Sequence, residues 1–149
     1  MDYLLDTNIL VHRIRLSLTG QKIEQQFRLF SGNHNLIISA VTKGEVLSFA
    51  KQSAWGIAKM NSLTALLDAL TCVPIDGASA LMDAYADIDT YSQGKHLLYP
   101  PPPEFTSRNM GKNDLWIAAT SFLLDIPLLT TDLDFDHLHP HFISVIKVS

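Results

Sequence analysis

Short apolar runs alternate along the chain with stretches in which apolar residues recur every three or four positions. The runs "YLL", "LII" and "PLL" are continuous and short, which is typical of strands buried on both faces of a sheet. The longer stretches between them have the spacing of amphipathic helices. The predicted strands are residues 2–6, 35–39, 71–75, 126–131 and 142–148. The predicted helices are residues 9–18, 21–30, 56–70, 79–94 and 114–125, with a further helix that Ser39 caps and a short helical turn at 134–138.

Glycine and proline mark the predicted boundaries of these elements. Gly20 is expected to break the first helical stretch from the second. Pro74 cannot donate a backbone hydrogen bond, so the strand at 71–75 is expected at the edge of the sheet. Four consecutive prolines at 100–103 exclude a helix and predict a long irregular loop over 95–111.

The alternation of strands and helices predicts an α/β fold. Strands that follow one another through helices form mainly parallel sheets with right-handed crossovers. We therefore expect a three-layer α/β/α sandwich around a central, mainly parallel sheet. The 149 residues contain no internal repeat and no linker, so we expect one domain over residues 1–149.

The composition is that of a well-buried globular protein. Apolar residues make up 47% of the chain and charged residues 17%, which does not fit a disordered chain. No apolar run approaches the roughly 18 residues that a membrane-spanning helix needs, and the first residues do not resemble a signal peptide. The only cysteine, Cys72, cannot form an internal disulfide and is expected to be a buried, inert thiol. We therefore expect a cytoplasmic protein that does not bind membranes.

Four acidic residues, distant in sequence, are each placed where the predicted fold brings them to one edge of the sheet. Asp6 and Asp132 directly follow apolar strands, while Glu45 and Asp114 lie in the early turns of helices. Ligands bind beyond the carboxyl ends of parallel strands. Because four clustered carboxylates repel one another unless cations lie among them, the pattern predicts a site for Mg²⁺ or Mn²⁺.

Each of these acids also has an ordinary structural explanation. Asp6 and Asp114 could cap helices, and Asp132 could belong to a turn. Glu45 could be a surface residue of its helix. Taken together these explanations are weaker, because all four positions converge on one rim of the predicted sheet.

The charge of the chain argues against a broad nucleic-acid-binding surface. The net charge is −4, and without the four site acids eleven acidic residues balance eleven basic ones. Such a chain is not expected to hold nucleic acid by a broad surface that neutralises many phosphates. A small basic rim beside the acids is possible, although solvated surface charge would explain the same residues. The candidate RNA-binding residues are Arg13, Arg15, Lys43 and Lys112.

The strings around these acids resemble a known family. "LLDTNIL", Glu45 in the helix after the second strand, "NDLWIAAT" and "LLTTDLDF" look like a PIN domain, and within that family like the VapC-type toxin ribonucleases of toxin–antitoxin pairs. The resemblance implies a five-stranded parallel sheet of order 3-2-1-4-5. It also implies Mg²⁺- or Mn²⁺-dependent cleavage of single-stranded RNA by in-line attack of water on a phosphodiester.

The same resemblance assigns roles to individual residues and suggests partners. The acids that it implies as metal ligands and catalytic residues are Asp6, Glu45, Asp114 and Asp132. The accessory residues that it implies are Asn8, Thr130 and Asp134. It further implies an antitoxin protein that inserts a cation among the acids, and a homodimer. The segment 94–110 is longer than in compact members, so the RNA preference is not implied.

Other functions remain open or fit less well. A haloacid-dehalogenase-type phosphatase needs a second aspartate where this chain has Asn8, and the pattern of a response-regulator receiver is absent. A PIN-like module that binds RNA or protein without catalysis, and a PIN nuclease without an antitoxin, remain alternatives. The "HLHPH" tract lacks the spacing of a structural zinc site, and Trp55 and Trp116 are expected in the core.

Overall fold

The structure is a computed structural model that describes residues 1–77 and 79–149. The strands are β1 (Asp2–Leu5), β2 (Asn35–Ser39), β3 (Thr71–Val73), β4 (Leu128–Thr130) and β5 (Val145–Lys147). The helices are α1 (Thr7–Arg15), α2 (Leu18–Phe27), α3 (Ala40–Gln52), α4 (Ile57–Asp68), α5 (Ser79–Ser92) and α6 (Lys112–Leu124), with a short 3-10 helix η1 (Asp136–Leu138). The predicted order of strands and helices is therefore confirmed.

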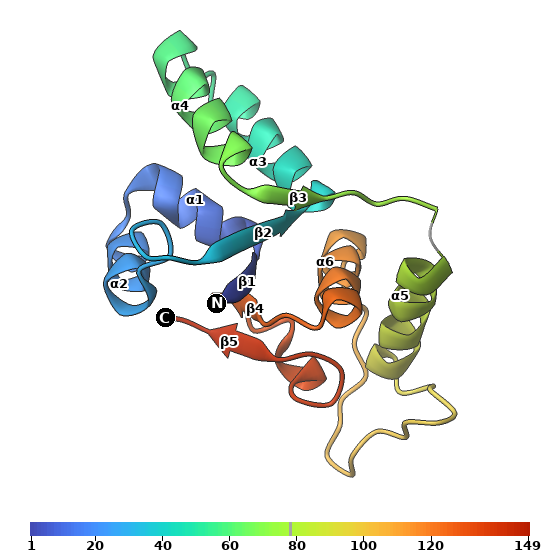
Figure 1. The fold of residues 1–149 in the computed structure, drawn as a ribbon. Coiled ribbons are helices and arrows are strands. Elements are labelled where there is room, and N and C mark those ends of the chain that lie inside the picture. Colours follow the sequence, from blue (N-terminus) through green and yellow to red (C-terminus); the bar gives the residue numbers. More distant parts are fainter. Residues whose placement is uncertain (78) are drawn as a thin grey trace.

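The strands form one parallel sheet whose order is β3-β2-β1-β4-β5 (Figure 1). This confirms the fold class and the strand order 3-2-1-4-5. β1 lies at the centre and pairs with β4, so that Leu5 is opposite Leu129. The next residues along these two strands, Asp6 and Thr130, are therefore neighbours at the carboxyl edge of the sheet.

Alternate side chains of the strands enter two separate cores, one on each face of the sheet. Successive residues of a strand point to opposite faces, so adjacent leucines and isoleucines serve different layers. Leu5, Ile38 and Leu129 pack against α1 to α4. Their neighbours Leu4, Ile37 and Leu128 pack against α5 and α6, which lie on the other side in Figure 1. This arrangement explains why the strand sequences read as continuous apolar runs.

The break between the first two helices is not at Gly20, where it was predicted. The chain turns at Leu16, which has a left-handed backbone with φ of 51°, and Ser17 then caps α2 by accepting a hydrogen bond from the Gly20 N–H at 3.0 Å. Gly20 lies inside α2. A Cβ at this position would be 2.5 Å from the carbonyl oxygen of His12, so the glycine permits the close approach of the two helices.

The prediction that Cys72 is buried is wrong, whereas the edge position of its strand is confirmed. Cys72 is exposed on β3. Because β3 is the outermost strand, only Val73 of its three residues packs against a core cluster. An edge strand thus leaves its thiol in solvent, although the sequence around it is apolar.

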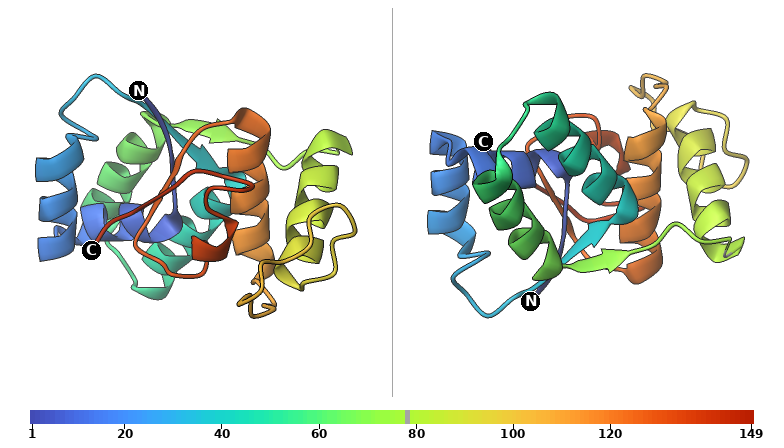
Figure 2. Two further views of the ribbon diagram at one scale, coloured as in Figure 1. Left: turned by 90° about the horizontal axis from the view of Figure 1, so that it is seen from below. Right: turned by 90° about the horizontal axis from the view of Figure 1, so that it is seen from above.

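The predicted irregular loop connects the C-terminal end of α5 to the N-terminal end of α6. It leaves α5 after Ser92 and enters α6 at Lys112. Both views in Figure 2 place this loop at the end of α6 that begins the helix. Within the described ranges, no helix is long and apolar enough to cross a membrane.

Candidate active site

Asp6 stands at the end of the central strand and is held by two hydrogen bonds. Its carboxylate accepts one from the Thr7 backbone N–H at 2.8 Å and one from the Thr130 hydroxyl at 2.6 Å. The residue is only 4% exposed. Burial raises the pKa of Asp6, and these two hydrogen bonds oppose the rise. Asp6 is also the N-cap of α1, so the helix-capping explanation is correct. It accounts for the oxygen that accepts from Thr7 but not for the one that accepts from Thr130.

Thr130 links Asp6 to the acids that follow β4. Its hydroxyl donates to Asp6, and its oxygen accepts a hydrogen bond from the Asp132 backbone N–H at 2.9 Å. Asp132 in turn accepts from the Asp134 N–H at 3.0 Å, as expected for a turn. The fully buried Thr130 therefore fixes the start of this turn against the central strand.

Glu45 reaches the same edge from α3. The Thr7 hydroxyl donates to its carboxylate at 2.8 Å and lies 3.2 Å from the Thr42 hydroxyl oxygen. Glu45 is the sixth residue of α3, and helical side chains lean toward the N-terminus, so its longer side chain can reach back to the start of α1. Thr7 directly follows Asp6 in the sequence, so its hydroxyl orients Glu45 toward the neighbourhood of Asp6.

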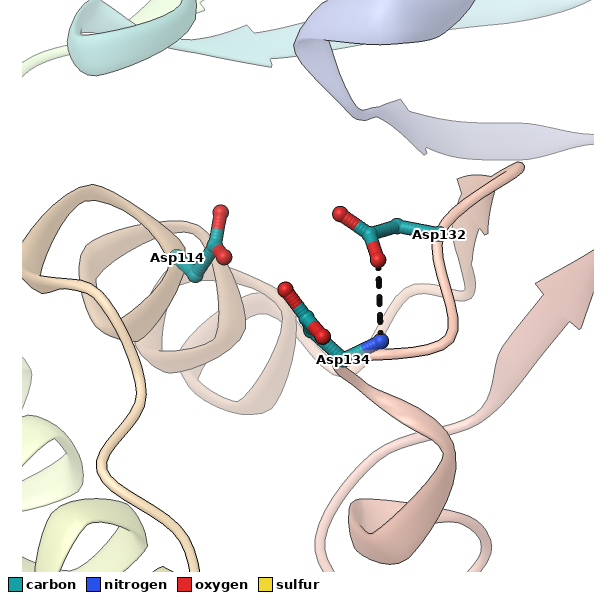
Figure 3. A group of neighbouring side chains, drawn as sticks. All are labelled: Asp114, Asp132 and Asp134. Atoms are coloured by element: carbon teal, nitrogen blue, oxygen red, sulfur yellow. Dashed lines mark hydrogen bonds between the residues drawn. The ribbon is translucent and has the colours of Figure 1, made fainter.

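Three aspartates from two elements converge in space (Figure 3). Asp114 comes from the first turn of α6, while Asp132 and Asp134 follow β4. One carboxylate oxygen of each lies within 4.8 Å of the others. Among the described residues this is the only group of histidine, cysteine and acidic side chains that could hold a metal ion. The predicted metal residues Asp6 and Glu45 lie beside this group but are not part of it, whereas Asp134, predicted as accessory, is.

The electrostatics of the group are strongly unfavourable for free carboxylates. Burial, followed by the charges of Asp6, Asp132, Asp134 and Glu45, raises the pKa of Asp114 to about 7. In the described part of the chain none of these five acids forms an ion pair with a lysine or arginine. Oxygen ligands with uncompensated negative charge fit a hard divalent cation such as Mg²⁺ or Mn²⁺.

Asn8 has a minor place in this network. Its side-chain oxygen is 3.5 Å from the Thr131 backbone nitrogen, the upper limit for a hydrogen bond. It therefore connects the first turn of α1 with the residue between Thr130 and Asp132. The hydrogen bonds to the Asp6 carboxylate come from Thr7 and Thr130 rather than from Asn8.

The candidate basic residues are dispersed. The guanidinium of Arg13 lies over the Phe30 ring at 4.8 Å and that of Arg15 over Phe49 at 4.7 Å. Phe49 lines a groove of about 520 Å³ together with Glu45 and Asn113, but Arg15 itself does not line it. Arg13 lines cavities on both sides of α1 instead. Lys43 is half-buried on α3, and Lys112 is exposed at the start of α6.

The histidine tract does not assemble a metal site. His137 is 2.8 Å from the Ser92 hydroxyl, His139 accepts from the Val145 N–H at 3.0 Å, and His141 stacks on Tyr91. Each histidine therefore has a different structural partner. Trp55 and Trp116 pack against the two core clusters, as predicted.

Sequence reasoning missed Thr7 and Thr42, the hydroxyl residues that contact or adjoin Glu45. Their contacts join α1 to α3 across 35 and 38 positions in sequence. Thr7 stands next to Asp6 in "LLDTNIL", which was the one available signal. A threonine in the first turn of a helix has ordinary reasons to be there, so that signal is weak.

The fold is similar to those of several solved structures. VapBC2 from Rickettsia felis, crystallised with a DNA fragment from its promoter, has a TM-score of 0.76 with 19% identity over 100% of both chains. VapBC-1 from nontypeable Haemophilus influenzae has a TM-score of 0.71 with 21% identity over 99% of this chain and 98% of that one. FitAcB from Neisseria gonorrhoeae gives 0.70 with 20% identity over 97% and 96%.

At these identities the structural similarity establishes the fold alone. A comparison with curated proteins found no match. The model of the PIN domain family, however, matches residues 3–139, which is nearly the whole chain and includes every candidate site acid. This chain therefore belongs to the PIN domain family.

Proposed function

We propose that this protein is a metal-dependent endoribonuclease acting as one domain over residues 1–149. The observation that carries the proposal is the convergence of Asp114, Asp132 and Asp134, beside Asp6 and Glu45, with no cation paired to any of them in the described part of the chain. Structural roles alone do not require five unpaired carboxylates at one sheet edge.

The residues of the site have separate tasks in this proposal. Asp114, Asp132 and Asp134 would hold Mg²⁺ or Mn²⁺, and Asp6 and Glu45 add negative charge beside them. When bound there, such an ion would supply a more acidic water and positive charge opposite the phosphodiester. Thr130 and Thr7 fix Asp6, Asp132 and Glu45 through their hydroxyl groups. The groove between α3 and the start of α6, which Glu45 and Asn113 line, leads RNA to the acids.

A cleavage assay tests the activity directly. The purified chain is incubated with single-stranded RNA, duplex RNA and single-stranded DNA in Mn²⁺, in Mg²⁺ and in excess EDTA. We expect cleavage of single-stranded RNA with either metal and none in EDTA, because carboxylates alone cannot neutralise a phosphodiester. Binding of RNA without cleavage in both metals would instead favour the non-catalytic module.

We further propose that the protein is the toxin of a toxin–antitoxin pair. Several structural neighbours are toxin–antitoxin complexes, and the acidic site described here has no basic partner within the described residues. An arginine of a second protein could enter among Asp114, Asp132 and Asp134 and pair bidentately with two oxygens.

Co-expression distinguishes a toxin from a nuclease without an antitoxin. We expect the chain alone to arrest growth, and a protein encoded by a neighbouring reading frame to restore growth and co-purify with the chain. Exchange of a basic residue in that partner for glutamine should weaken inhibition without removing the complex. Normal growth and no captured partner would identify a stand-alone nuclease. The homodimer stays a prediction, which the mass of the chain in solution tests.

A further inference from the structure

A small polar pocket lies on the loop between α5 and α6, apart from the acids. Its volume is about 220 Å³, and it is lined by Gln93, Lys95, Ser107, Arg108 and Asn109. The loop closes on itself there, because the Arg108 N–H donates to the Ser92 carbonyl at 2.7 Å and the Lys95 N–H to the Thr90 carbonyl at 3.0 Å. The backbone of the pocket is thus tied to the end of α5.

Four of the five residues that line this pocket are exposed, and their side chains have no partner among the described residues. The ammonium of Lys95, the guanidinium of Arg108, the hydroxyl of Ser107 and the amide of Asn109 make no hydrogen bond or ion pair among the described residues. The fifth residue, Gln93, uses its amide to bind Asp89 at 3.0 Å, and Asp89 does not line the pocket. Two basic residues and two neutral donors therefore line one pocket with no acid in its lining, which suits an anion.

The distribution of charge makes this arrangement unusual for the chain. Residues 60–149 have only four basic residues against eleven acidic ones, and one of the four, Lys147, is paired with Asp136. Two of the remaining three, Lys95 and Arg108, line the same pocket. The pocket therefore gathers most of the unpaired positive charge of this acidic region.

The pocket is connected to the acidic edge of the sheet. Ser92 is fully buried; its carbonyl accepts from Arg108, and its hydroxyl is 2.8 Å from His137. His137 belongs to η1, which begins two residues after Asp134. On the other side, Arg108 precedes Asp114 by six residues, and the loop lies at the end of α6 that carries Asp114 (Figure 2).

We propose that Lys95 and Arg108, with Ser107 and Asn109, bind a backbone phosphate of the RNA beside the phosphate that is cleaved. This inference rests on the proposed function, because it names a second contact of the same substrate. A phosphate at this point would anchor the strand on the longer loop while the acids act on a neighbouring linkage. Positive charge there also offsets the repulsion between RNA and the acidic edge.

A charge-removing variant tests the phosphate contact through cleavage kinetics in Mn²⁺. For K95A/R108A, we expect kcat/KM on a short single-stranded RNA to fall about fivefold at about 0.1 M salt, with the slope of log(kcat/KM) against log salt less negative by about 0.7. We expect kcat to change less than about twofold, because the contact forms equally before and during the reaction. K95R/R108K should behave like the wild type.

The matched control is K22A/K51A, which removes the same charge from exposed positions on α2 and α3. We expect its salt slope to equal that of the wild type. Equal slopes for all the variants, with RNA cleavage intact, would overturn the proposed contact and leave the nuclease assignment standing.

A second measurement does not depend on nuclease activity. Inorganic phosphate is titrated into the wild type and K95A/R108A, and the backbone amide signals of residues 93, 95 and 107–109 are followed by NMR. We expect shifts in the wild type that the variant lacks. If the wild type cleaves no RNA, the proposed function has failed; amide shifts would then assign the pocket to another phosphate ligand, and their absence would overturn the anion site itself.

Discussion

Exchange of Asp6 for asparagine should reduce metal-dependent RNA cleavage by more than about a hundredfold while leaving the fold intact. The substitution removes a buried negative charge next to Asp132 and Glu45 but keeps the oxygen that caps α1. The pKa of Asp6 is raised by burial, so its ionised form costs stability in the metal-free protein. We therefore expect the melting temperature in EDTA to stay constant or to rise.

Asp2 offers the matched control for this substitution. It begins the same strand, is exposed, and lies at the opposite end of β1. Asp2→Asn makes the same chemical change and should retain cleavage within about twofold of the wild type. If Asp6→Asn cleaves RNA as fast as Asp2→Asn, the assigned site is wrong. If Asp6→Asn instead unfolds, the hydrogen bonds that the carboxylate accepts from Thr7 and Thr130 contribute more to stability than the repulsion among the acids costs.

The fold was predictable because its determinants are local and periodic. The runs around Leu4, Ile37 and Leu128 are apolar at every position, since each strand is covered on both faces. Such runs specify a parallel α/β sheet without knowledge of contacts. The helix boundary at Leu16 was not predictable in this way. It depends on a left-handed backbone at a leucine, a conformation that sequence preferences disfavour.

The candidate site was predictable in its elements but not in its exact membership. Strand ends and helix starts placed Asp6, Asp114 and Asp132 at one edge, because topology alone brings those points together. Which oxygens meet depends on the turn after β4, where Thr130 and Asp132 direct Asp134 toward Asp114. That turn involves side-chain hydrogen bonds over two residues, which apolar patterning does not encode.

The basic residues show a different limit of sequence reasoning. Arg13 and Arg15 are close to Asp6 in sequence, yet their guanidinium groups pack on Phe30 and Phe49. Lys95 and Arg108 are separated by the proline-rich segment and were not singled out, but a closed loop brings them together. Distance in sequence does not predict where the charged group of a lysine or arginine lies. These side chains have several rotatable bonds, so the packing around them determines the position of the charge.

In metal-free protein, exchange of Asp114 for asparagine should raise the melting temperature by an amount that grows with pH. Burial and neighbouring acids raise the pKa of Asp114 from 3.8 to about 7, so the folded chain binds this proton more tightly than the unfolded chain. Unfolding then releases a proton between about pH 4 and pH 7, and the stability of the wild type falls as the pH rises through that window. Asparagine does not titrate, so the variant does not lose stability through this group as the pH rises.

The quantity to measure is the difference in melting temperature between the two proteins at each pH. The titration of His137 changes the stability of both proteins with pH in the direction opposite to that of Asp114. Burial, then the charge of Arg108, lowers the pKa of His137 to about 4, so its contribution to stability grows with pH between about pH 4 and 6.5. Both proteins share this term, and subtraction removes it. We expect the difference in melting temperature to increase from pH 4.5 to 7 and to be constant above about pH 7.5.

Added Mn²⁺ should reverse the order of the two proteins. Only the folded wild type presents all three carboxylates of Asp114, Asp132 and Asp134, so a metal concentration of a hundred times the dissociation constant would stabilise it by about 2.7 kcal/mol. The variant lacks one ligand and should gain much less. An equal gain in both proteins would place the ion elsewhere. A pH-independent difference in EDTA would show instead that Asp114 is ionised normally and that the acids are not close enough in solution to repel one another.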